Sequence, residues 1–328
     1  MKKKGSCFLC VITVFVLLVS SCGATLAEAP AEPAKAARTV MLYFCGSNLE
    51  TYYEMVSWNL RQIMNADISA DINVIGLTGG STEWHTDAEY LEGAEAIGRD
   101  QPVQAWLFSG KNAQNAENGH GKMTLLSGWP EVYSSALLSD EKTLRTFINF
   151  AAENYPADIY DLVLWDHGGG PHGGFGIDDY DPTDTAMSVS GVMRAVKESK
   201  VDRFNIIDFD ACLMSSAEII AALAEYADYL VVSSETEPGF GQEYTIWFNA
   251  LSADPRISGF ELGKVIVDAY VAFYEDENSE GYGQEGVLSV VDTKKLPGQN
   301  DSAFDQNGGN HEQRADNHRQ RQQEAQFP

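Results

Sequence analysis

Two short apolar segments constrain the fold of this chain more than any other feature, because each leads to a reactive side chain. Residues 162–165 read Leu-Val-Leu-Trp and precede His167, and residues 204–207 read Phe-Asn-Ile-Ile and precede Cys212. Runs this short and apolar are typical of strands that are buried on both faces, as in parallel sheets. Ligands of open α/β sheets bind beyond the carboxyl ends of the strands. We therefore expect His167 and Cys212 at one edge of a sheet if the two strands are neighbours.

A cysteine and a histidine at one edge predict a nucleophile and its base. A free thiol has a pKa of about 8.5, and a nearby imidazole or helix N-terminus raises its thiolate fraction. Residues 213–226 are rich in helix formers, so we expect the Cys212 sulfur at the positive end of a helix. Gly168, Gly169 and Gly170 follow the histidine and leave backbone N–H groups free for a developing oxyanion.

Strand and helix patterns alternate along the chain. This alternation predicts an α/β fold with a mostly parallel central sheet and helices on both faces, formed by residues 39–295 as one large domain. Strands are expected at residues 40–45, 72–78, 103–108, 162–166, 204–208, 229–233 and 287–291, with residues 122–126 as a hairpin partner of 103–108. Helices are expected at residues 49–64, 141–153, 189–197, 213–226 and 260–274.

The N-terminal residues indicate export. Three lysines, Lys2 to Lys4, precede an apolar stretch at residues 8–19 that is too short to span a bilayer and is typical of a secretory signal. The sequence Val19-Ser20-Ser21-Cys22 resembles a bacterial lipobox, so we expect a signal peptide at 1–21, lipid on Cys22 and a flexible tether at 22–38. Ordinary cleavage near residues 24–29 is the alternative. Either route places the protein in the bacterial cell envelope, lipid-anchored or secreted.

The charge balance restricts the partners. The chain has 22 basic and 48 acidic residues, which argues against nucleic acid and against electrostatic attraction to an anionic membrane surface. An acidic protein suits basic substrates, although solubility alone can account for most of these carboxylates. Residues 296–328 are almost entirely polar, so we expect a disordered tail there.

Cysteine usage gives no disulfide framework. Cys7 and Cys10 leave with the signal peptide and Cys22 carries lipid, so only Cys45 and Cys212 remain. Cys45 ends an expected strand and is most simply a small buried hydrophobic residue. The alternative is a regulatory disulfide between Cys45 and Cys212 at the shared sheet edge.

The motifs Asp-His-Gly-Gly-Gly at 166–170 and Asp-Ala-Cys-Leu-Met at 210–214 resemble those of the clostripain family of cysteine peptidases, relatives of caspases and gingipains. Residues 39–48, 154–165 and 233–244 agree with the same family. The resemblance implies a caspase-like fold with His167 as general base, Cys212 as nucleophile, and the N–H groups of Gly168 and Cys212 as the oxyanion hole. It also implies that Asp210 lies in the S1 pocket and selects Arg or Lys at P1.

The implied function is that of a lipid-anchored, monomeric cysteine endopeptidase that cleaves peptides or proteins after Arg or Lys without a required cofactor. Calcium is a candidate ligand, because some relatives are calcium-activated and Asp178, Asp179 and Asp181 share a loop. Relatives are often cleaved between the histidine and the cysteine. Here Arg194 is the first basic residue after His167, and both Arg194 and Lys197 lie in an expected helix.

The sequence also bears on two other functions. A serine esterase needs a Gly-x-Ser-x-Gly turn, which this sequence lacks. A catalytically silent lipoprotein that binds peptides or a partner through a protease-like cleft remains the alternative, and the unusual tail would fit a truncated protein of that kind. A thiol-directed electrophile separates this alternative from a peptidase, since only a peptidase should react preferentially at Cys212.

Overall fold

A computed structural model of the chain describes residues 35–99 and 101–296. The predicted signal peptide, Cys22, the tether up to residue 34 and the tail from residue 297 lie outside the described residues. Strand β1 (Ala36–Cys45) begins before the predicted domain start at residue 39. Among the helices of the described ranges, none combines the length and apolar character that a membrane crossing requires.

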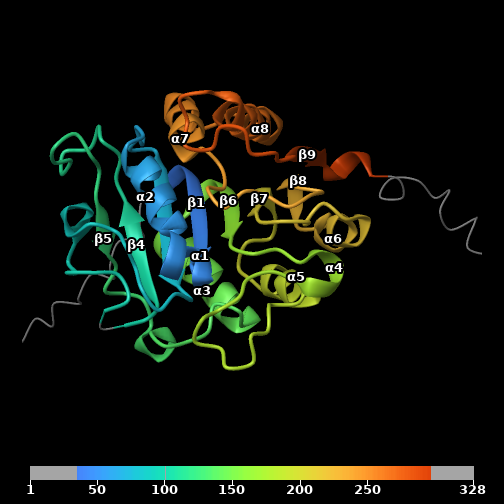
Figure 1. Ribbon diagram of the computed structural model, residues 1–328, viewed down its shortest axis with the longest axis horizontal. Helices are drawn as coiled ribbons and strands as arrows, with labels where there is room; N and C mark the ends of the chain where they lie inside the picture. Colours follow the sequence, from blue (N-terminus) through green and yellow to red (C-terminus); the bar gives the residue numbers. More distant parts are fainter. Residues whose placement is uncertain (1–34, 100, 297–328) are drawn as a thin grey trace, which may run out of the picture. The chain divides into compact units, whose positions relative to one another are not determined.

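The described residues form a nine-stranded sheet in the order β3-β5-β4-β2-β1-β6-β7-β8-β9 (Figure 1). The five central strands from β2 to β8 in this order run parallel, whereas β4, β5 and β9 join by antiparallel pairing. The predicted α/β class and the predicted hairpin are both confirmed. The remaining strands are β2 (Ile72–Gly79), β3 (Leu91–Glu92), β4 (Gln104–Phe108), β5 (Met123–Leu125), β6 (Ala157–Trp165), β7 (Phe204–Asp210), β8 (Ala227–Val232) and β9 (Ser289–Asp292).

Helices cover both faces of this sheet. One face carries α3, α5 and α6, and the other carries α2, α7 and α8 (Figure 1). The helices are α1 (Ser47–Tyr53), α2 (Met55–Met64), α3 (Glu141–Asn154), α4 (Gly170–Gly173), α5 (Val189–Lys197), α6 (Ala217–Leu223), α7 (Tyr244–Ala253) and α8 (Gly259–Glu275).

Strand β1 shows why the central strands are apolar throughout. Met41 and Tyr43 point into the core below α3 and α5, whereas Leu42 and Phe44 point into the core below α2 and α7. Both sets are fully buried. A strand covered on two faces cannot alternate apolar and polar residues, so its sequence becomes a continuous apolar run.

The register of the central strands brings three loops to one edge. Trp165 of β6 pairs with Phe44 of β1 on one side and with Asp210 of β7 on the other. The chain therefore leaves all three strands at nearly the same height. This register confirms that the strands preceding His167 and Cys212 are neighbours.

The helix expected at residues 49–64 is interrupted. Glu54 adopts a left-handed conformation with φ of 60° and separates α1 from α2. The turn lets the buried carboxylate of Glu50 accept hydrogen bonds from the Ser57 N–H at 2.8 Å and the Ser57 hydroxyl at 2.6 Å. These bonds satisfy the N–H and the hydroxyl of a residue in the first turn of α2. The break between the two helices is therefore stabilised by Glu50.

The helix expected at residues 213–226 starts later than predicted, at Ala217. Leu213 has a φ of 63°, and the Ser216 side chain accepts a hydrogen bond from the Ile219 N–H as the helix cap. The prediction that the Cys212 sulfur lies at a helix N-terminus is therefore wrong. A short turn separates Cys212 from α6, because the left-handed residue next to the cysteine cannot continue into a helix.

Candidate active site

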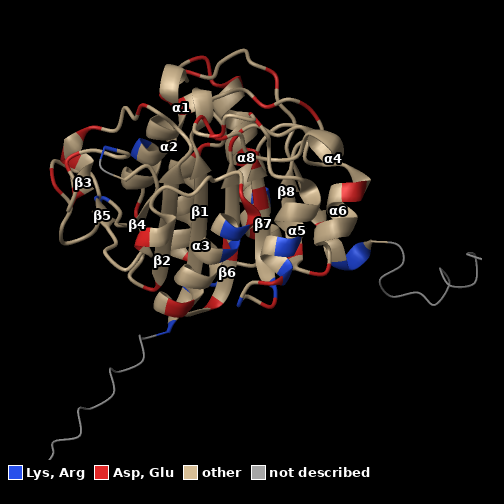
Figure 2. Cartoon of the chain, turned by 90° about the horizontal axis from the view of Figure 1, so that it is seen from below, with Lys and Arg blue, Asp and Glu red and all other residues tan. Residues whose placement is uncertain are grey.

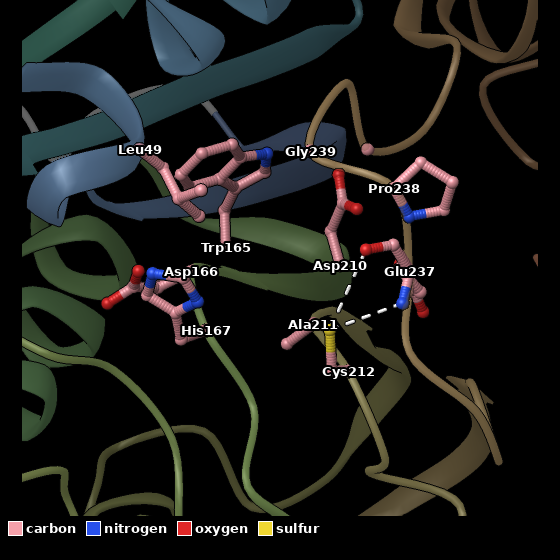
Figure 3. A pocket seen from close by; sticks show the side chains of 11 residues that line it. Leu49, Trp165, Asp166, His167, Asp210, Ala211, Cys212, Glu237, Pro238 and Gly239 are labelled. Carbon is pink, nitrogen blue, oxygen red and sulfur yellow. Dashed lines mark hydrogen bonds between the residues drawn. The ribbon is translucent and has the colours of Figure 1, made fainter. Parts of the chain in front are cut away.

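A cavity of about 110 Å³ opens beyond the carboxyl ends of β6 and β7. It contains the predicted base His167, the predicted nucleophile Cys212 and the predicted specificity residue Asp210. In the close-up, His167 lies on one side of the cavity, and Cys212, Asp210 and Glu237 lie on the other (Figure 3). The lining residues are Leu49, Trp165, Asp166, His167, Asp210, Ala211, Cys212, Glu237, Pro238, Gly239 and Gly241.

His167 follows β6 and is half-buried. Its Nε2 lies 2.7 Å from Oδ1 of Asn48, which belongs to the first turn of α1. Burial lowers the pKa of the imidazole, while the charges of Asp179 and Asp184 oppose this shift. The net result is a neutral imidazole near pH 7, which is the form that accepts a proton.

Cys212 follows β7 and has a free, half-exposed thiol. Its Sγ accepts a hydrogen bond from the Glu237 N–H at 3.2 Å and donates to the Glu237 carbonyl oxygen at 3.7 Å (Figure 3). An N–H aimed at the sulfur stabilises negative charge there when the thiol ionises. The backbone of Glu237 thus supplies part of the favourable environment that was expected from a helix N-terminus.

The backbones of Gly168 and Cys212 lie side by side. A Cβ atom built on Gly168 would lie 2.0 Å from the Cys212 carbonyl oxygen, so no other residue fits at this position. No hydrogen bond within the described part of the chain uses the N–H of Gly168 or of Cys212. Two adjacent unpaired N–H groups are what an oxyanion hole requires.

Asp210 is the last residue of β7 and is buried. Its Oδ2 accepts hydrogen bonds from the Gln242 N–H at 3.1 Å and from the Tyr244 hydroxyl at 2.8 Å. Burial raises the pKa of the carboxyl to about 6, and these hydrogen bonds limit the rise. Gly241 has a φ of 63°, and a Cβ there would come within 2.7 Å of the same Asp210 oxygen. A glycine is therefore needed beside Asp210.

Glu237 is a cavity residue that sequence reasoning did not identify. Both of its carboxyl oxygens are buried, and among the described residues no N–H or hydroxyl group donates a hydrogen bond to either of them. Burial, followed by the nearby charges of Asp210 and Asp208, raises the pKa of Glu237 well above its usual value. The only signal in the sequence was its place in the segment 233–244, which agrees with the clostripain family.

The loop at residues 237–244 is held in place by Asn59 of α2, whose side chain is fully buried. The Asn59 amide donates to the carbonyl oxygens of Phe240 at 3.0 Å and Gln242 at 3.2 Å. Its oxygen accepts the indole N–H of Trp165 at 2.9 Å. One side chain therefore links the wall of the cavity to β6.

Asp166 and Cys45 lie directly behind the site. Asp166 is buried and accepts hydrogen bonds from the Ser47 hydroxyl at 2.7 Å and the Ile177 N–H at 2.5 Å, and burial raises its pKa to about 7. Cys45 is fully buried, as expected of a small hydrophobic residue, and its thiol donates to the Ile177 carbonyl oxygen at 3.2 Å. Strand β6 lies between β1, which ends at Cys45, and β7, which precedes Cys212. Two strand spacings, about 9–10 Å, exceed the reach of a disulfide.

The three candidate calcium ligands are engaged separately. Asp178 is buried and accepts the Leu138 and Tyr180 N–H groups, Asp179 accepts the Thr51 hydroxyl, and Asp181 accepts the Thr183 N–H and hydroxyl. Within residues 35–99 and 101–296, no three His, Cys, Asp or Glu side chains gather as a possible metal site. Calcium binding by Asp178, Asp179 and Asp181 stays a prediction.

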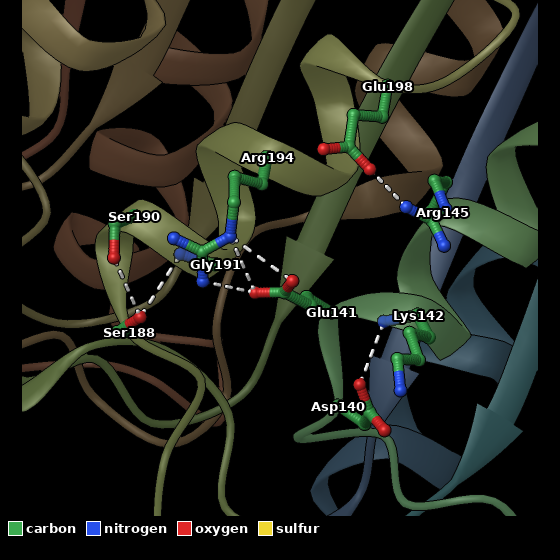
Figure 4. Close-up of polar contacts among 9 residues, drawn as sticks. All are labelled: Asp140, Glu141, Lys142, Arg145, Ser188, Ser190, Gly191, Arg194 and Glu198. Atoms are coloured by element: carbon green, nitrogen blue, oxygen red, sulfur yellow. Dashed lines mark hydrogen bonds and ion pairs between the residues drawn. The ribbon is translucent and has the colours of Figure 1, made fainter.

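Arg194 and Lys197 both lie in α5, as the sequence predicts. Nε of Arg194 lies 3.2 and 3.1 Å from the two carboxylate oxygens of Glu141, at the start of α3 (Figure 4). A protease that cuts after Arg194 must first unwind this helix and release the ion pair.

A mostly parallel α/β sheet with a cysteine and a histidine at its carboxyl edge is the arrangement of caspase-like cysteine peptidases. Residues 43–303 match the family described as the clostripain family, and the chain belongs to that family. It is 25% identical to clostripain of Hathewaya histolytica over 238 residues, which are 66% of this chain and 42% of that protein. The chain thus spans less than half the length of this relative.

Two solved structures share the fold. The first is a secreted C11 cysteine protease from Bacteroides thetaiotaomicron in complex with an irreversible peptide inhibitor, with a TM-score of 0.59 and 21% identity over 79% of this chain and 67% of that chain. The second is an inactive zymogen C11 protease from Parabacteroides distasonis, with a TM-score of 0.57 and 23% identity over 80% of this chain and 63% of that chain.

Proposed function

We propose that this protein is a cysteine endopeptidase that cleaves peptide bonds after Arg or Lys. The observation that carries the proposal is the cavity in which a histidine, a cysteine and a buried aspartate from adjacent strand ends meet. His167 is the general base, Cys212 the nucleophile and Asp210 the specificity residue. The N–H groups of Gly168 and Cys212 form the oxyanion hole.

The reaction uses each of these groups in turn. His167 takes the thiol proton of Cys212, and the sulfur attacks the carbonyl carbon of the scissile bond. The oxygen that becomes negative accepts hydrogen bonds from the two N–H groups. The imidazolium then donates its proton to the leaving amine, and a water molecule activated by His167 hydrolyses the thioester.

The acidic wall of the cavity supports a basic P1 side chain. Asp210 and Glu237 line the cavity, Asp208 lies close enough to raise the pKa of Glu237, and no lining residue is Lys or Arg. A guanidinium or ammonium group supplies the donors that the Glu237 oxygens lack. Figure 2 shows further Asp and Glu residues on the loops near α1 and α4, which favours the approach of a cationic peptide.

The experiment compares four peptides that differ only at P1, which is Arg, Lys, citrulline or norleucine. Citrulline keeps the shape of arginine without its charge. We expect kcat/KM for the two neutral peptides to be lower by at least about 100-fold, because each leaves buried carboxyl groups without a charged partner. Cys212→Ala should cleave none of the four. Equal cleavage of the arginine and citrulline peptides would contradict the proposed specificity.

We also propose that the protein is exported and held at a membrane by lipid on Cys22. The support is the basic and apolar N-terminal stretch followed by Val19-Ser20-Ser21-Cys22. A diacylated cysteine followed by a tether would keep the peptidase near the cell surface, where extracellular peptides are available.

A further inference from the structure

We propose that Asn48 is a positioning residue that keeps the imidazole proton of His167 on Nε2, so that Nδ1 is the nitrogen that takes the proton of Cys212. This inference rests on the proposed function, in which His167 is the base. Beyond that function, the inference specifies which tautomer of His167 acts as the base and which side chain selects this tautomer.

The tautomer follows from the chemistry of the contact. Oδ1 of Asn48 lies 2.7 Å from Nε2 of His167. An amide oxygen only accepts hydrogen bonds, so Nε2 must carry a hydrogen. A neutral imidazole has one N–H, which leaves the lone pair on Nδ1. Because burial lowers the pKa of His167, the neutral form prevails near pH 7 and the choice of tautomer matters.

Asn48 is the one hydrogen-bond partner of the His167 ring among the residues that the structure describes. Asp179 and Asp184 act on the ring through their charge, without a hydrogen bond to it. Their charges favour a protonated ring, but neither carboxylate forms the hydrogen bond that would hold the proton on one particular nitrogen. The selection of one tautomer therefore falls to Asn48.

The turn that carries Asn48 is held by hydrogen bonds to neighbouring strand ends. Ser47 is fully buried with a left-handed φ of 46°, and its hydroxyl donates to Asp166 at 2.7 Å. Asp166 directly precedes His167 in the chain. The Gly46 N–H donates to the Gly79 carbonyl oxygen at 2.8 Å. A non-glycine residue keeps such a conformation only when its surroundings hold it there, and here the hydrogen bond to Asp166 ties the turn to the residue before His167.

Loss of the Asn48 oxygen should therefore affect the base without affecting the pocket. For Asn48→Ala we expect kcat to fall on the order of 10- to 100-fold, because a fraction of the molecules then hold the proton on Nδ1 and the ring is free to turn. KM for an arginine peptide should stay nearly unchanged, since Asp210 and Glu237 are untouched. Asn48→Asp keeps an acceptor oxygen and should recover much of the rate. Its charge should also move the acid limb of kcat/KM to higher pH.

The decisive measurement is the tautomer itself, read from the nitrogen chemical shifts of protein labelled with ¹⁵N-histidine. Cys212→Ala is the background that prevents cleavage, and His167→Ala in this background identifies the His167 signals. We expect Nε2 to carry the hydrogen in the parent protein and a mixture of both tautomers after Asn48→Ala. An Nδ1-protonated ring in the parent, or an unchanged spectrum in the variant, would overturn the inference.

Asn65→Ala is the matched control, because Oδ1 of Asn65 bonds Nδ1 of His120 in an asparagine–histidine pair outside the cavity. This variant should leave kcat and the His167 signals unchanged. The proposed function has its own test in the rate at which iodoacetamide alkylates Cys212. If His167→Ala leaves that rate and its pH dependence unchanged, His167 is not the base. The tautomer is measured on a Cys212→Ala background by chemical shift, so its outcome does not depend on the alkylation result.

Discussion

The backbone of Gly168 packs directly against the backbone of Cys212, and a methyl group on Gly168 would come within 2.0 Å of the Cys212 carbonyl oxygen and 2.9 Å of its nitrogen. This contact joins the loop after β6 to the loop after β7. It fixes the relative position of the base and the nucleophile, and it sets the two proposed oxyanion donors beside each other.

Gly168→Ala should consequently abolish peptide cleavage. The added methyl group must push the two loops apart, and an oxyanion hole loses on the order of 100-fold or more in rate when one donor is misplaced. Gly173→Ala is the control in the same loop, because a Cβ there meets no atom within 4 Å. Measurement of kcat for both variants, with circular dichroism to verify folding, checks this prediction. Full activity in Gly168→Ala would show that the contact is dispensable.

Asp210→Asn should reduce kcat/KM for arginine and lysine peptides by about 100-fold or more, equivalent to roughly 3 kcal/mol of transition-state binding. The amide keeps the shape of the side chain but removes the charge that faces the P1 cation. Asp202→Asn removes an exposed carboxylate elsewhere and serves as the control. Alkylation of Cys212 by iodoacetamide should be nearly the same in both variants. An unchanged kcat/KM would exclude Asp210 from substrate recognition.

The pH dependence of KM should reflect the ionisation of the Asp210 carboxyl group. The pKa of Asp210 is raised to about 6, and Asp208, Glu237 and Tyr244 are the titratable groups that face it. Below pH 6 the carboxyl becomes neutral, so KM for an arginine peptide should rise as the pH falls from 7 to 5. Burial lowers the pKa of His167, so kcat should decline less over this range. A constant KM with a falling kcat would point to the histidine instead.

Protein stability should fall as the pH rises from about 4 to about 7. Burial raises the pKa of Asp166 to about 7, whereas an unfolded aspartate titrates near 4. Between these values the folded protein holds a proton that the unfolded chain has released, so the free energy of unfolding decreases with pH. Asp166→Asn removes this titration. Urea denaturation should show its stability relative to the parent improving by about 2–3 kcal/mol between pH 5 and pH 8. Parallel pH profiles of the two proteins would contradict the assignment.

Cys22→Ala should release the protein from the membrane fraction into the soluble fraction of expressing cells. The variant has no thiol to lipidate, while its signal stretch is intact and still directs export. Immunoblots of separated fractions check this, with Cys7→Ala as the control inside the signal stretch. Continued membrane association of Cys22→Ala would refute the lipobox interpretation.

The central strands could be predicted because a strand that is buried on both faces has a short continuous run of apolar residues. Residues 162–166 and 204–208 were expected as strands and belong to β6 and β7. Shorter or atypical elements were not predictable in this way. Strand β3 has only two residues, and α7 is apolar on most of its surface, so neither shows a clear periodicity. The start of α6 had a usable signal in Ser216, a helix-capping residue.

Within the site, the sequence predicted the residues that directly follow buried strands, namely His167, Asp210 and Cys212. It missed Asn48 and Glu237, which reach the cavity from other loops. Their roles depend on where the chain folds in three dimensions, and Asn and Glu on polar loops are too common to stand out. The structure supplies this information through one short contact to His167 and through two buried Glu237 oxygens that no N–H or hydroxyl of the described residues contacts.

Asn59 gives the cavity a practical property. Three of its hydrogen bonds hold the 237–244 loop against Trp165 before any ligand binds. The cavity wall therefore loses little conformational entropy when a ligand binds. Most of the entropy lost on binding is that of the ligand. Inhibitor chemistry directed at this protein should gain more from cyclising a short cationic ligand than from lengthening it.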